Sequence, residues 1–321
     1  MNSVLLVGFG NVASKIDDDG RSQLFGHIGA LSALNIKLSA VIEKSPKSIA
    51  IDYCTKNNIQ IFSDYEELIS LGMRQFDLGV FCLPTSKAEV IHQIIQHIAF
   101  KNIVLEKPVS YKKELANNIF LDLKKNNVRF IVNYQRNWDE GYEKVHRWIK
   151  NNTITDAYFR TSTAIAQSGS HMLELILRFF PKAEVVNILR LDSKRIVGNE
   201  VAEPGVVIHF ISNKANLFLI CDSENINEFT FSGVIHSATG RLCFDEGEGQ
   251  INLASKSLGN ERIGPQITNY IDSSIMHKWV NEKWIEGCYE ALLAEKNLDE
   301  YHVRSMRVVQ IIDDIMNDKS R

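Results

Sequence analysis

The sequence has 321 residues, of which 45% are hydrophobic and 23% charged, with a formal net charge of -3 and a pI of about 6.3. This balance is typical of a globular protein with room for two domains, and it argues against wholesale disorder. Because a strongly basic surface is not expected at this charge, we expect no nucleic-acid partner.

The first ten residues, MNSVLLVGFG, have no basic segment before their short apolar run, so they predict a first strand and not a signal peptide. No window approaches the ~18 apolar residues that span a bilayer, so we expect no membrane partner. The cysteines form no C-x-x-C pair, and we interpret them as reduced thiols of a cytoplasmic protein. They are Cys54, Cys82, Cys221, Cys243 and Cys288.

Short apolar runs alternate with amphipathic stretches over the first half of the chain. The runs cover residues 3–8, 37–42, 78–83, 102–105 and 129–134, and residues 88–99 and 111–126 between them have a helical period. Nearly continuous apolar runs are typical of strands buried on both faces. The alternation therefore predicts a doubly wound parallel sheet, a Rossmann domain over residues 1–134.

Residues 135–321 have a different pattern and are predicted to form a second α/β domain. Helices are expected near residues 139–150 and 170–180, strands over 202–211, 215–222, 228–236 and 241–245, and closing helices over 273–296 and 299–318. Short turns between sequential strands favour an antiparallel sheet. At the turn of residues 237–240, Gly240 is expected to supply a positive φ.

A glycine-rich turn directly follows the first predicted strand and fits the dinucleotide fingerprint G-x-G-x-x-G/A. The first glycine permits a tight turn, the second lets the backbone approach a pyrophosphate, and a small third residue allows close helix packing. The next helix N-terminus is expected to offer free N–H groups to the phosphates. The predicted cofactor contacts here are Gly8, Phe9, Gly10, Asn11 and Val12.

An acidic residue, Glu43, closes the second predicted strand. A carboxylate there can accept hydrogen bonds from ribose hydroxyls and would repel a 2′-phosphate, which favours NAD; Lys44 and Ser45 follow and leave NADP open as an alternative. The acid comes about ten residues later than the usual ~20, and the excess lies in residues 14–26.

Three further motifs, in this order and spacing, resemble the glucose-fructose oxidoreductase, inositol dehydrogenase and MocA family over nearly the whole chain. They are Val104-Leu105-Glu106-Lys107-Pro108, Val132-Asn133-Tyr134-Gln135-Arg136 and Gly169-Ser170-His171. The resemblance implies a Rossmann domain followed by an α/β domain with an open, mainly antiparallel sheet that mediates homodimers or homotetramers. It also implies hydride transfer between a nicotinamide cofactor and a carbinol carbon of a sugar-like small molecule.

The family motifs imply that Lys107 and His171 are the catalytic residues. Oxidising an alcohol requires a base for the hydroxyl proton, which a histidine can supply, and a lysine ammonium can stabilise the developing alkoxide. The alternatives are a solvated loop lysine and a histidine packed for stability. The bond before Pro108 is expected to be cis. The other histidines show no metal-ligand spacing, so we expect no metal site.

The resemblance also implies cofactor contacts outside the glycine-rich turn, although the family histidine that usually follows Pro84 is missing here. These contacts are Leu83, Pro84, Thr85, Glu106, Lys107 and Gln135.

Substrate contacts are expected from Tyr134, Arg136, Gln167, His171 and Glu174. Arg136 presents a planar fork suited to a carboxylate or phosphate, which favours a sugar acid or nucleotide sugar, and an interdomain salt bridge is the alternative. Gln167 stands where many family members have an aspartate, and it cannot act as an acid or base. Glu174, one helical turn after His171, either holds the imidazole or is a surface residue.

Three function classes follow from these motifs. The first is a dehydrogenase or reductase that acts on CH–OH groups. The second is a glycosidase of the same fold that uses bound NAD without net redox change, and the third is a non-catalytic cofactor-binding regulator. Lys107 and His171 favour the first class, while Gln167 in place of an aspartate leaves the third class open.

Overall fold

The computed structural model describes residues 3–10, 12–13, 15–16, 24–197, 201–222, 230–256, 270–279 and 284–317. The chain divides into two compact units, which we describe separately. Unit 1 comprises Met1–Gln135 and Lys283–Asp313, and unit 2 comprises Arg136–Glu282 and Asp314–Arg321. Unit 1 ends one residue after the expected boundary at residue 134. Residues 283–313, which were expected in the second domain with the rest of 135–321, lie in unit 1.

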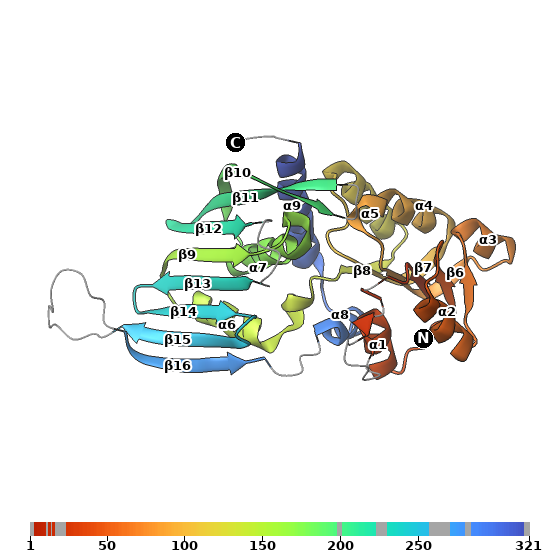
Figure 1. The fold of residues 1–321 in the computed structure, drawn as a ribbon, viewed down its shortest axis with the longest axis horizontal. Helices are drawn as coiled ribbons and strands as arrows, with labels where there is room; N and C mark the ends of the chain where they lie inside the picture. The colour runs from red at the N-terminus through yellow and green to blue at the C-terminus, as the bar shows by residue number, and fades with distance from the viewer. Residues whose placement is uncertain are drawn as a thin grey trace. The chain divides into compact units, whose positions relative to one another are not determined.

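Unit 1 contains a six-stranded parallel sheet in the order β5-β4-β1-β6-β7-β8. Figure 1 labels β6, β7 and β8 of this sheet. The strand order reverses at β1, which pairs with β4 on one side and β6 on the other, so the predicted doubly wound sheet is confirmed. The strands are β1 (Val4–Val7), β4 (Ala40–Ile42), β5 (Gln60–Phe62), β6 (Gln75–Phe81), β7 (Ala99–Leu105) and β8 (Arg129–Val132).

Helices cover both faces of this sheet, with α4 and α5 on one side and α1 and α8 on the other (Figure 1). The predicted apolar stripe of α4 is observed: Ile91, Ile94 and Ile95 are buried. The helices of this unit are α1 (His27–Ala33), α2 (Ser48–Lys56), α3 (Tyr65–Ser70), α4 (Ala88–His97), α5 (Lys113–Lys125) and α8 (Trp284–Leu293), with most of α9 (Asp299–Met316). None of the helices in the described part of the chain is long and apolar enough to cross a membrane.

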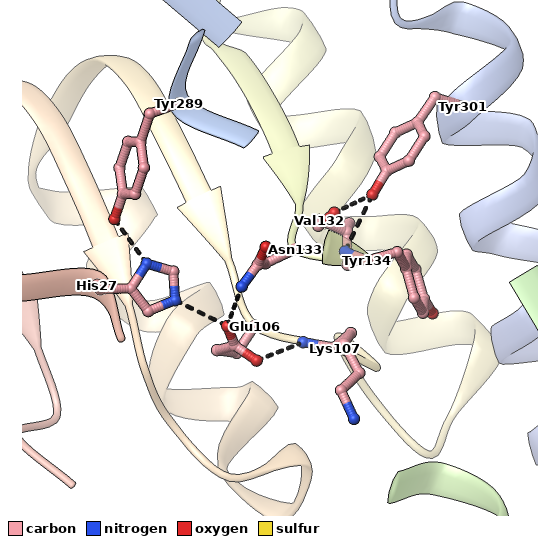
Figure 2. Close-up of polar contacts among 8 residues, drawn as sticks. All are labelled: His27, Glu106, Lys107, Val132, Asn133, Tyr134, Tyr289 and Tyr301. Carbon is pink, nitrogen blue, oxygen red and sulfur yellow. Dashed lines mark hydrogen bonds and ion pairs between the residues drawn. The ribbon is translucent and has the colours of Figure 1, made fainter. Parts of the chain in front are cut away.

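The outer edge of β8 pairs with no strand of this sheet and is instead contacted by the C-terminal helices. Tyr301 of α9 donates its hydroxyl hydrogen to the Val132 carbonyl (Figure 2). The Arg129 side chain donates to the carbonyl of Leu292 at 2.8 Å. The Tyr301 bond satisfies a carbonyl of the edge strand, and the Arg129 side chain ties the first residue of β8 to the end of α8. The Tyr301 contact also fixes the carboxyl end of β8, from which the Asn133 motif follows.

Unit 2 is built on an eight-stranded sheet in the order β10-β11-β12-β9-β13-β14-β15-β16 (Figure 1). All neighbours are antiparallel except β12 and β9, so the expected mainly antiparallel sheet is confirmed. Buried and more exposed residues alternate strictly along β13, so that one face is buried. The strands are β9 (Ile154–Thr161), β10 (Glu184–Val197), β11 (Val201–Ser212), β12 (Ala215–Cys221), β13 (Phe231–Ser237), β14 (Gly240–Asp245), β15 (Gln250–Lys256) and β16 (Tyr270–Lys278).

Helices α6 (Glu140–Lys150) and α7 (Ser170–Phe179) of this unit occupy the predicted positions. The helix predicted over residues 273–296 is wrong in its first part, because residues up to Lys278 pair with β15 as strand β16. Strand β9 was not predicted at all, although it lies in the middle of the sheet.

The turn before β14 also differs from the expectation, because Gly240 does not have a positive φ. The hydroxyl oxygen of Ser237 closes the turn by accepting hydrogen bonds from the backbone N–H of Thr239 and of Gly240. A Cβ on Gly240 would lie 2.7 Å from the Ala254 carbonyl oxygen on β15. Glycine is needed here for close strand approach and not for a left-handed conformation.

Candidate functional site

Glycine stands at Gly8 and at Gly10, in the turn after β1, for two different structural reasons. Gly8 has φ +87°, and a Cβ there would lie 2.8 Å from the Cys82 carbonyl oxygen. Gly10 has no such φ, and a Cβ would meet no protein atom within 4 Å. The chain itself therefore requires glycine at Gly8 but not at Gly10, where the open space suits the approach of a phosphate-bearing ligand. Asn11, another predicted contact, lies outside the described residues.

The helix after this turn does not begin where the fingerprint predicts. Helix α1 begins at His27 after Gly26, and its first N–H groups, those of His27 and Ile28, donate to the carbonyls of Val12 and Ala13. The expectation that this helix N-terminus offers free N–H groups to phosphates is therefore corrected. A phosphate at this end of β1 would have to be bound by the N–H groups of the turn itself, where the Val12 side chain is 48% exposed.

An insertion between the turn and α1 explains the late arrival of the acidic residue. It includes a two-stranded ladder of β2 (Lys15–Ile16) with β3 (Leu24–Phe25). The chain leaves the turn after Ala13 and returns at Gly26, so the usual spacing to Glu43 is lengthened without moving the end of β4.

Glu43 follows the last residue of β4 and lies against the glycine-rich turn. Its Oε2 accepts a hydrogen bond from the Phe9 backbone N–H at 2.8 Å, and its Oε1 accepts one from the Ser45 N–H at 3.1 Å. The carboxylate and the turn are thus at the same carboxyl edge of the sheet, where open α/β sheets bind ligands.

The loop after β6 reaches the same edge. A Cβ on Gly8 would lie 3.1 Å from the Cδ2 atom of Leu83, so Leu83 packs directly beside the turn. Pro84 precedes a 3-10 turn over Thr85–Lys87. The predicted cofactor contacts Leu83, Pro84 and Thr85 therefore follow β6, the strand that pairs with β1.

Glu106, Lys107 and Pro108 follow β7, and the Lys107–Pro108 bond is cis, as expected. The Glu106 carboxylate does not point freely into solvent. Its Oε1 lies 2.7 Å from His27 Nε2 and accepts a hydrogen bond from Asn133 Nδ2 at 2.7 Å (Figure 2). The side chain that was expected to contact the cofactor is therefore engaged by the protein, and Lys107, half-buried, follows it.

His27 and Glu106 form a buried ion pair. Burial opposes the charged imidazole, but the neighbouring Cys82 and Glu106 outweigh it and raise the His27 pKa to about 10. Burial also opposes the charged carboxylate, and His27 and Asn133 outweigh it and lower the Glu106 pKa. Sequence reasoning missed His27, because a histidine on a short helix has no signature until its partners, 79 and 262 residues away, are known.

Tyr134 and Gln135, which follow β8 and were predicted to contact ligands, lie in different surroundings. Tyr134 is 1% exposed, and its backbone N–H donates to the Tyr301 hydroxyl oxygen at 3.2 Å (Figure 2). Its ring is therefore part of the packing of unit 1, while Gln135 is half-buried and begins a 3-10 turn over Gln135–Trp138.

In unit 2, a kinked turn over Ile165–Gly169 precedes the predicted catalytic histidine. Gln167 breaks the helical path with ψ -111°, and α7 begins at Ser170, which places His171 in its first turn at 8% exposure. Glu203, fully buried on β11, supports the turn by accepting a hydrogen bond from the Ala166 N–H at 2.9 Å.

Glu174 and Arg136 are both buried in unit 2. Glu174 is fully buried and accepts a hydrogen bond from Asn137, which excludes the surface alternative. Arg136 donates to both carboxylate oxygens of Glu246 and lies 3.8 Å above the Phe231 ring. Burial opposes its charge, but Glu246 outweighs it and raises the Arg136 pKa. The salt bridge left open for Arg136 is observed, although it lies within unit 2 and not between domains.

No protein-family model matches the sequence, and no curated protein matches it at a significant level. Solved structures do match its fold. A 3-ketoreductase from Actinomadura kijaniata, KijD10, has a TM-score of 0.74 at 14% identity, covering 98% of this chain and 96% of that chain. The WlbA dehydrogenase from Bordetella pertussis has a TM-score of 0.71 at 14% identity, covering 98% and 95%. The oxidoreductase yvaA from Bacillus subtilis has a TM-score of 0.72 at 14% identity, covering 99% and 97%. At this identity the match establishes the shared fold.

Proposed function

We propose that the protein is an NAD-dependent oxidoreductase that transfers a hydride between nicotinamide and a carbinol carbon, with NADP as the alternative cofactor. The observation that carries this proposal is the Glu43 carboxylate lying 2.8 Å from the Phe9 N–H of the glycine-rich turn. A turn that approaches a pyrophosphate beside an acid that receives ribose hydroxyls is the arrangement a dinucleotide needs. The open space at Gly10 supports the same conclusion.

The proposed catalytic residues are Lys107 and His171, and each is described in its own unit. In unit 1, Lys107 follows β7 at the carboxyl edge of the sheet, and its ammonium would stabilise the alkoxide that develops on the substrate oxygen. In unit 2, His171 in the first turn of α7 would accept the hydroxyl proton. The cofactor, when bound, supplies the hydride acceptor or donor. Gln167 would hydrogen-bond a substrate hydroxyl, and Glu174 would support this part of unit 2.

We assign the substrate to sugar acids or nucleotide sugars. Two structures of the same fold support this class, because one was crystallised with TDP-benzene and NADP and another with NADH and UDP-GlcNAcA. Because the Arg136 guanidinium donates to both carboxylate oxygens of Glu246, we assign it no contact with the substrate. Tyr134, buried in unit 1, is given a packing role.

We further propose that the protein forms a homodimer or homotetramer through the face of the unit 2 sheet that its helices leave open. Tyr158, Leu189 and Ile275 are 47%, 56% and 51% exposed. Tyr158 stacks on Phe218 with ring centroids 5.5 Å apart. Exposed apolar patches of this kind mark association sites. Light scattering of the protein and of Tyr158→Lys would test this: a monomeric wild type would contradict it.

The function is tested by following the reduced-nicotinamide absorbance with NAD and NADP against a panel of sugars, sugar acids and nucleotide sugars. We expect turnover on a nucleotide sugar or sugar acid that disappears in Lys107→Ala while cofactor binding persists. Turnover of neutral polyols alone would overturn the substrate class. Tight cofactor binding with no turnover on any substrate would overturn the enzyme assignment in favour of a cofactor-binding regulator.

A further inference from the structure

A groove of about 300 Å³ lies between α5 and α9, within unit 1 (Figure 1). We call it the α5–α9 groove. The two helices meet beneath it through Phe120 and His302, whose ring centroids are 5.9 Å apart. None of the described residues that line the groove is assigned above to the cofactor or the substrate. An occupant of this groove would therefore be a ligand outside the proposed reaction.

The floor and one part of the wall are apolar. Phe120 and Leu121 of α5 face Val303 and Met306 of α9 across the groove. Phe120 is 4% exposed, whereas Leu121 and Val303 are 55% and 60% exposed. Single exposed apolar residues are ordinary, but two that line the same hollow make a contiguous apolar patch of the kind that binds ligands.

The rim of the groove is basic. It carries Lys113, Lys124 and Arg307, and the described residues that line the groove include no carboxylate. Lys113, Phe120 and Lys124 follow one another at i, i+7 and i+11, so the two lysines and the apolar ring share one face of α5. Asp122, the neighbour of Leu121 in sequence, pairs instead with His92 of α4 at 2.9 Å.

The His302 ring adds no charge to the floor at neutral pH. Its Nε2–H donates to the Phe130 carbonyl at 2.8 Å. Burial lowers the His302 pKa, and the charge of Lys124 acts in the same direction. The groove thus combines an uncharged, mainly apolar floor with a cationic rim, which is complementary to an anion with an apolar body.

The volume limits how large this ligand is. Small-molecule sites occupy roughly 300–1,000 Å³, and the α5–α9 groove is at the lower end of that range. We propose that the groove binds a medium-chain alkyl carboxylate, with its chain on Leu121, Val303 and Met306 and its carboxylate on a lysine of the rim. This site is separate from the proposed reaction, and its test requires neither cofactor nor turnover.

The probe is decanoate, added to the full-length protein below its micelle concentration. Protein with ¹³C-labelled methionine methyl groups would be followed by NMR, with the signal of Met306, one of six methionines, assigned through Met306→Leu. We expect a saturable shift of the Met306 signal and a dissociation constant from calorimetry. Lys113→Gln combined with Lys124→Gln should weaken binding at least about tenfold, because the carboxylate loses its cations. Lys56→Gln, at an exposed lysine of α2, is the matched control and should leave binding unchanged.

The apolar part of the site is tested in the same way. Val303→Glu places a carboxylate on the apolar wall and should abolish binding, whereas Leu71→Glu alters a leucine of unit 1 that is 60% exposed outside the groove and should not. Octanoate should bind about tenfold more weakly than decanoate, since two fewer methylene groups leave water. Decylamine, which has the same chain and a positive charge, should not shift the Met306 signal.

No Met306 shift with decanoate would overturn the proposal, as would an equal shift with decylamine. Decanoate binding that the double lysine variant does not weaken would show that the ligand lies elsewhere, and would also overturn it. Self-association that is lost in Val303→Glu but kept in Tyr158→Lys would show that a second copy of the chain covers the groove instead. All the substituted lysines, Val303 and Leu71 are exposed, and circular dichroism would confirm that the variants fold.

Discussion

The His302 ring lies parallel to the Phe130 ring with centroids 4.0 Å apart, and its Nε2–H donates to the Phe130 backbone carbonyl at 2.8 Å. One side chain of α9 therefore both packs on the edge strand β8 and satisfies its outward carbonyl. Together with Tyr301 and Arg129, this contact makes the C-terminal helices an integral part of unit 1. The strand they hold leads directly into Asn133, which donates a hydrogen bond to Glu106.

Substitutions at His302 should separate these two contributions to stability. His302→Phe keeps the ring but leaves a backbone carbonyl unpaired, and should lower the free energy of unfolding by about 1–3 kcal/mol. His302→Ala also loses the ring packing and should cost about 3–5 kcal/mol. Urea-induced unfolding would measure both. His92→Ala, which removes a half-exposed ion pair with Asp122, should cost less than about 1 kcal/mol. Equal effects at His302 and His92 would contradict the role of α9.

The two glycines of the turn should respond differently to alanine. Gly8→Ala forces a side chain into a φ of +87° beside the Cys82 carbonyl and should destabilise the protein by about 1–3 kcal/mol. Gly10→Ala meets no protein atom, so stability should stay within about 0.5 kcal/mol while NADH binding weakens at least about tenfold. Thermal unfolding and NADH fluorescence titration give the two readouts. A Gly10→Ala variant with normal NADH binding would argue against a pyrophosphate at this turn.

Glu43 should set the preference for NAD over NADP. Glu43→Gln keeps the shape of the side chain and an oxygen that can accept the Phe9 N–H, but it removes the charge that would repel a 2′-phosphate. We expect the ratio of NADPH to NADH dissociation constants, measured by fluorescence, to fall by about tenfold, or ~1.4 kcal/mol. Glu66→Gln on α3 is the matched control, since Glu66 is an exposed glutamate of the same unit. An unchanged ratio would show that Glu43 does not set the preference between NAD and NADP.

Patterns that repeat within one element were readable from the sequence. The apolar stripe of α4 and the alternating apolar runs predict the doubly wound sheet, because burial on one or both faces imposes a local period. The fingerprint also placed Glu43 beside the Gly8–Gly10 turn, and the structure joins them through the Phe9 N–H, while their contact with a cofactor stays a prediction. The cis bond before Pro108 followed from the family motif and was confirmed.

Features that depend on partners far away in the chain could not be predicted from the sequence. Residues of β16 were assigned to a helix, because only pairing with β15 makes them a strand. The assignment of residues 283–313 to unit 1 depends on contacts with β8, which no local pattern encodes. The buried ion pairs of Arg136 with Glu246 and of His27 with Glu106 join residues 110 and 79 positions apart, so one sequence alone gives no signal for either.

Replacing only one member of the Arg136–Glu246 pair in unit 2 should lower the free energy of unfolding substantially. Its atoms are 6% exposed on both side chains, and the Tyr142 hydroxyl donates to Glu246 at 2.6 Å. Arg136→Met leaves a buried carboxylate without its cation and should cost about 3–5 kcal/mol in urea unfolding. Adding Glu246→Gln should recover part of that loss. Additive effects of the two substitutions would show that the pair is not coupled.

The His27–Glu106 pair should give unit 1 a distinct pH dependence of stability. The His27 pKa rises from 6.5 to about 10 on folding, so its contribution is fully present below pH 6.5 and is lost as the pH rises through about 10. The Glu106 pKa is lowered, so its contribution is present above its unfolded value of 4.5 and is lost as the pH falls through the folded one. Between pH 6.5 and 10, the stability advantage of wild type over His27→Gln should therefore shrink with rising pH, on the order of 1 kcal/mol per pH unit.

The His302 pKa is lowered by burial, so that histidine titrates on the acid side and does not mimic this effect. Urea unfolding of both proteins across this range makes the comparison, and parallel curves would show that His27 is neutral in the folded protein.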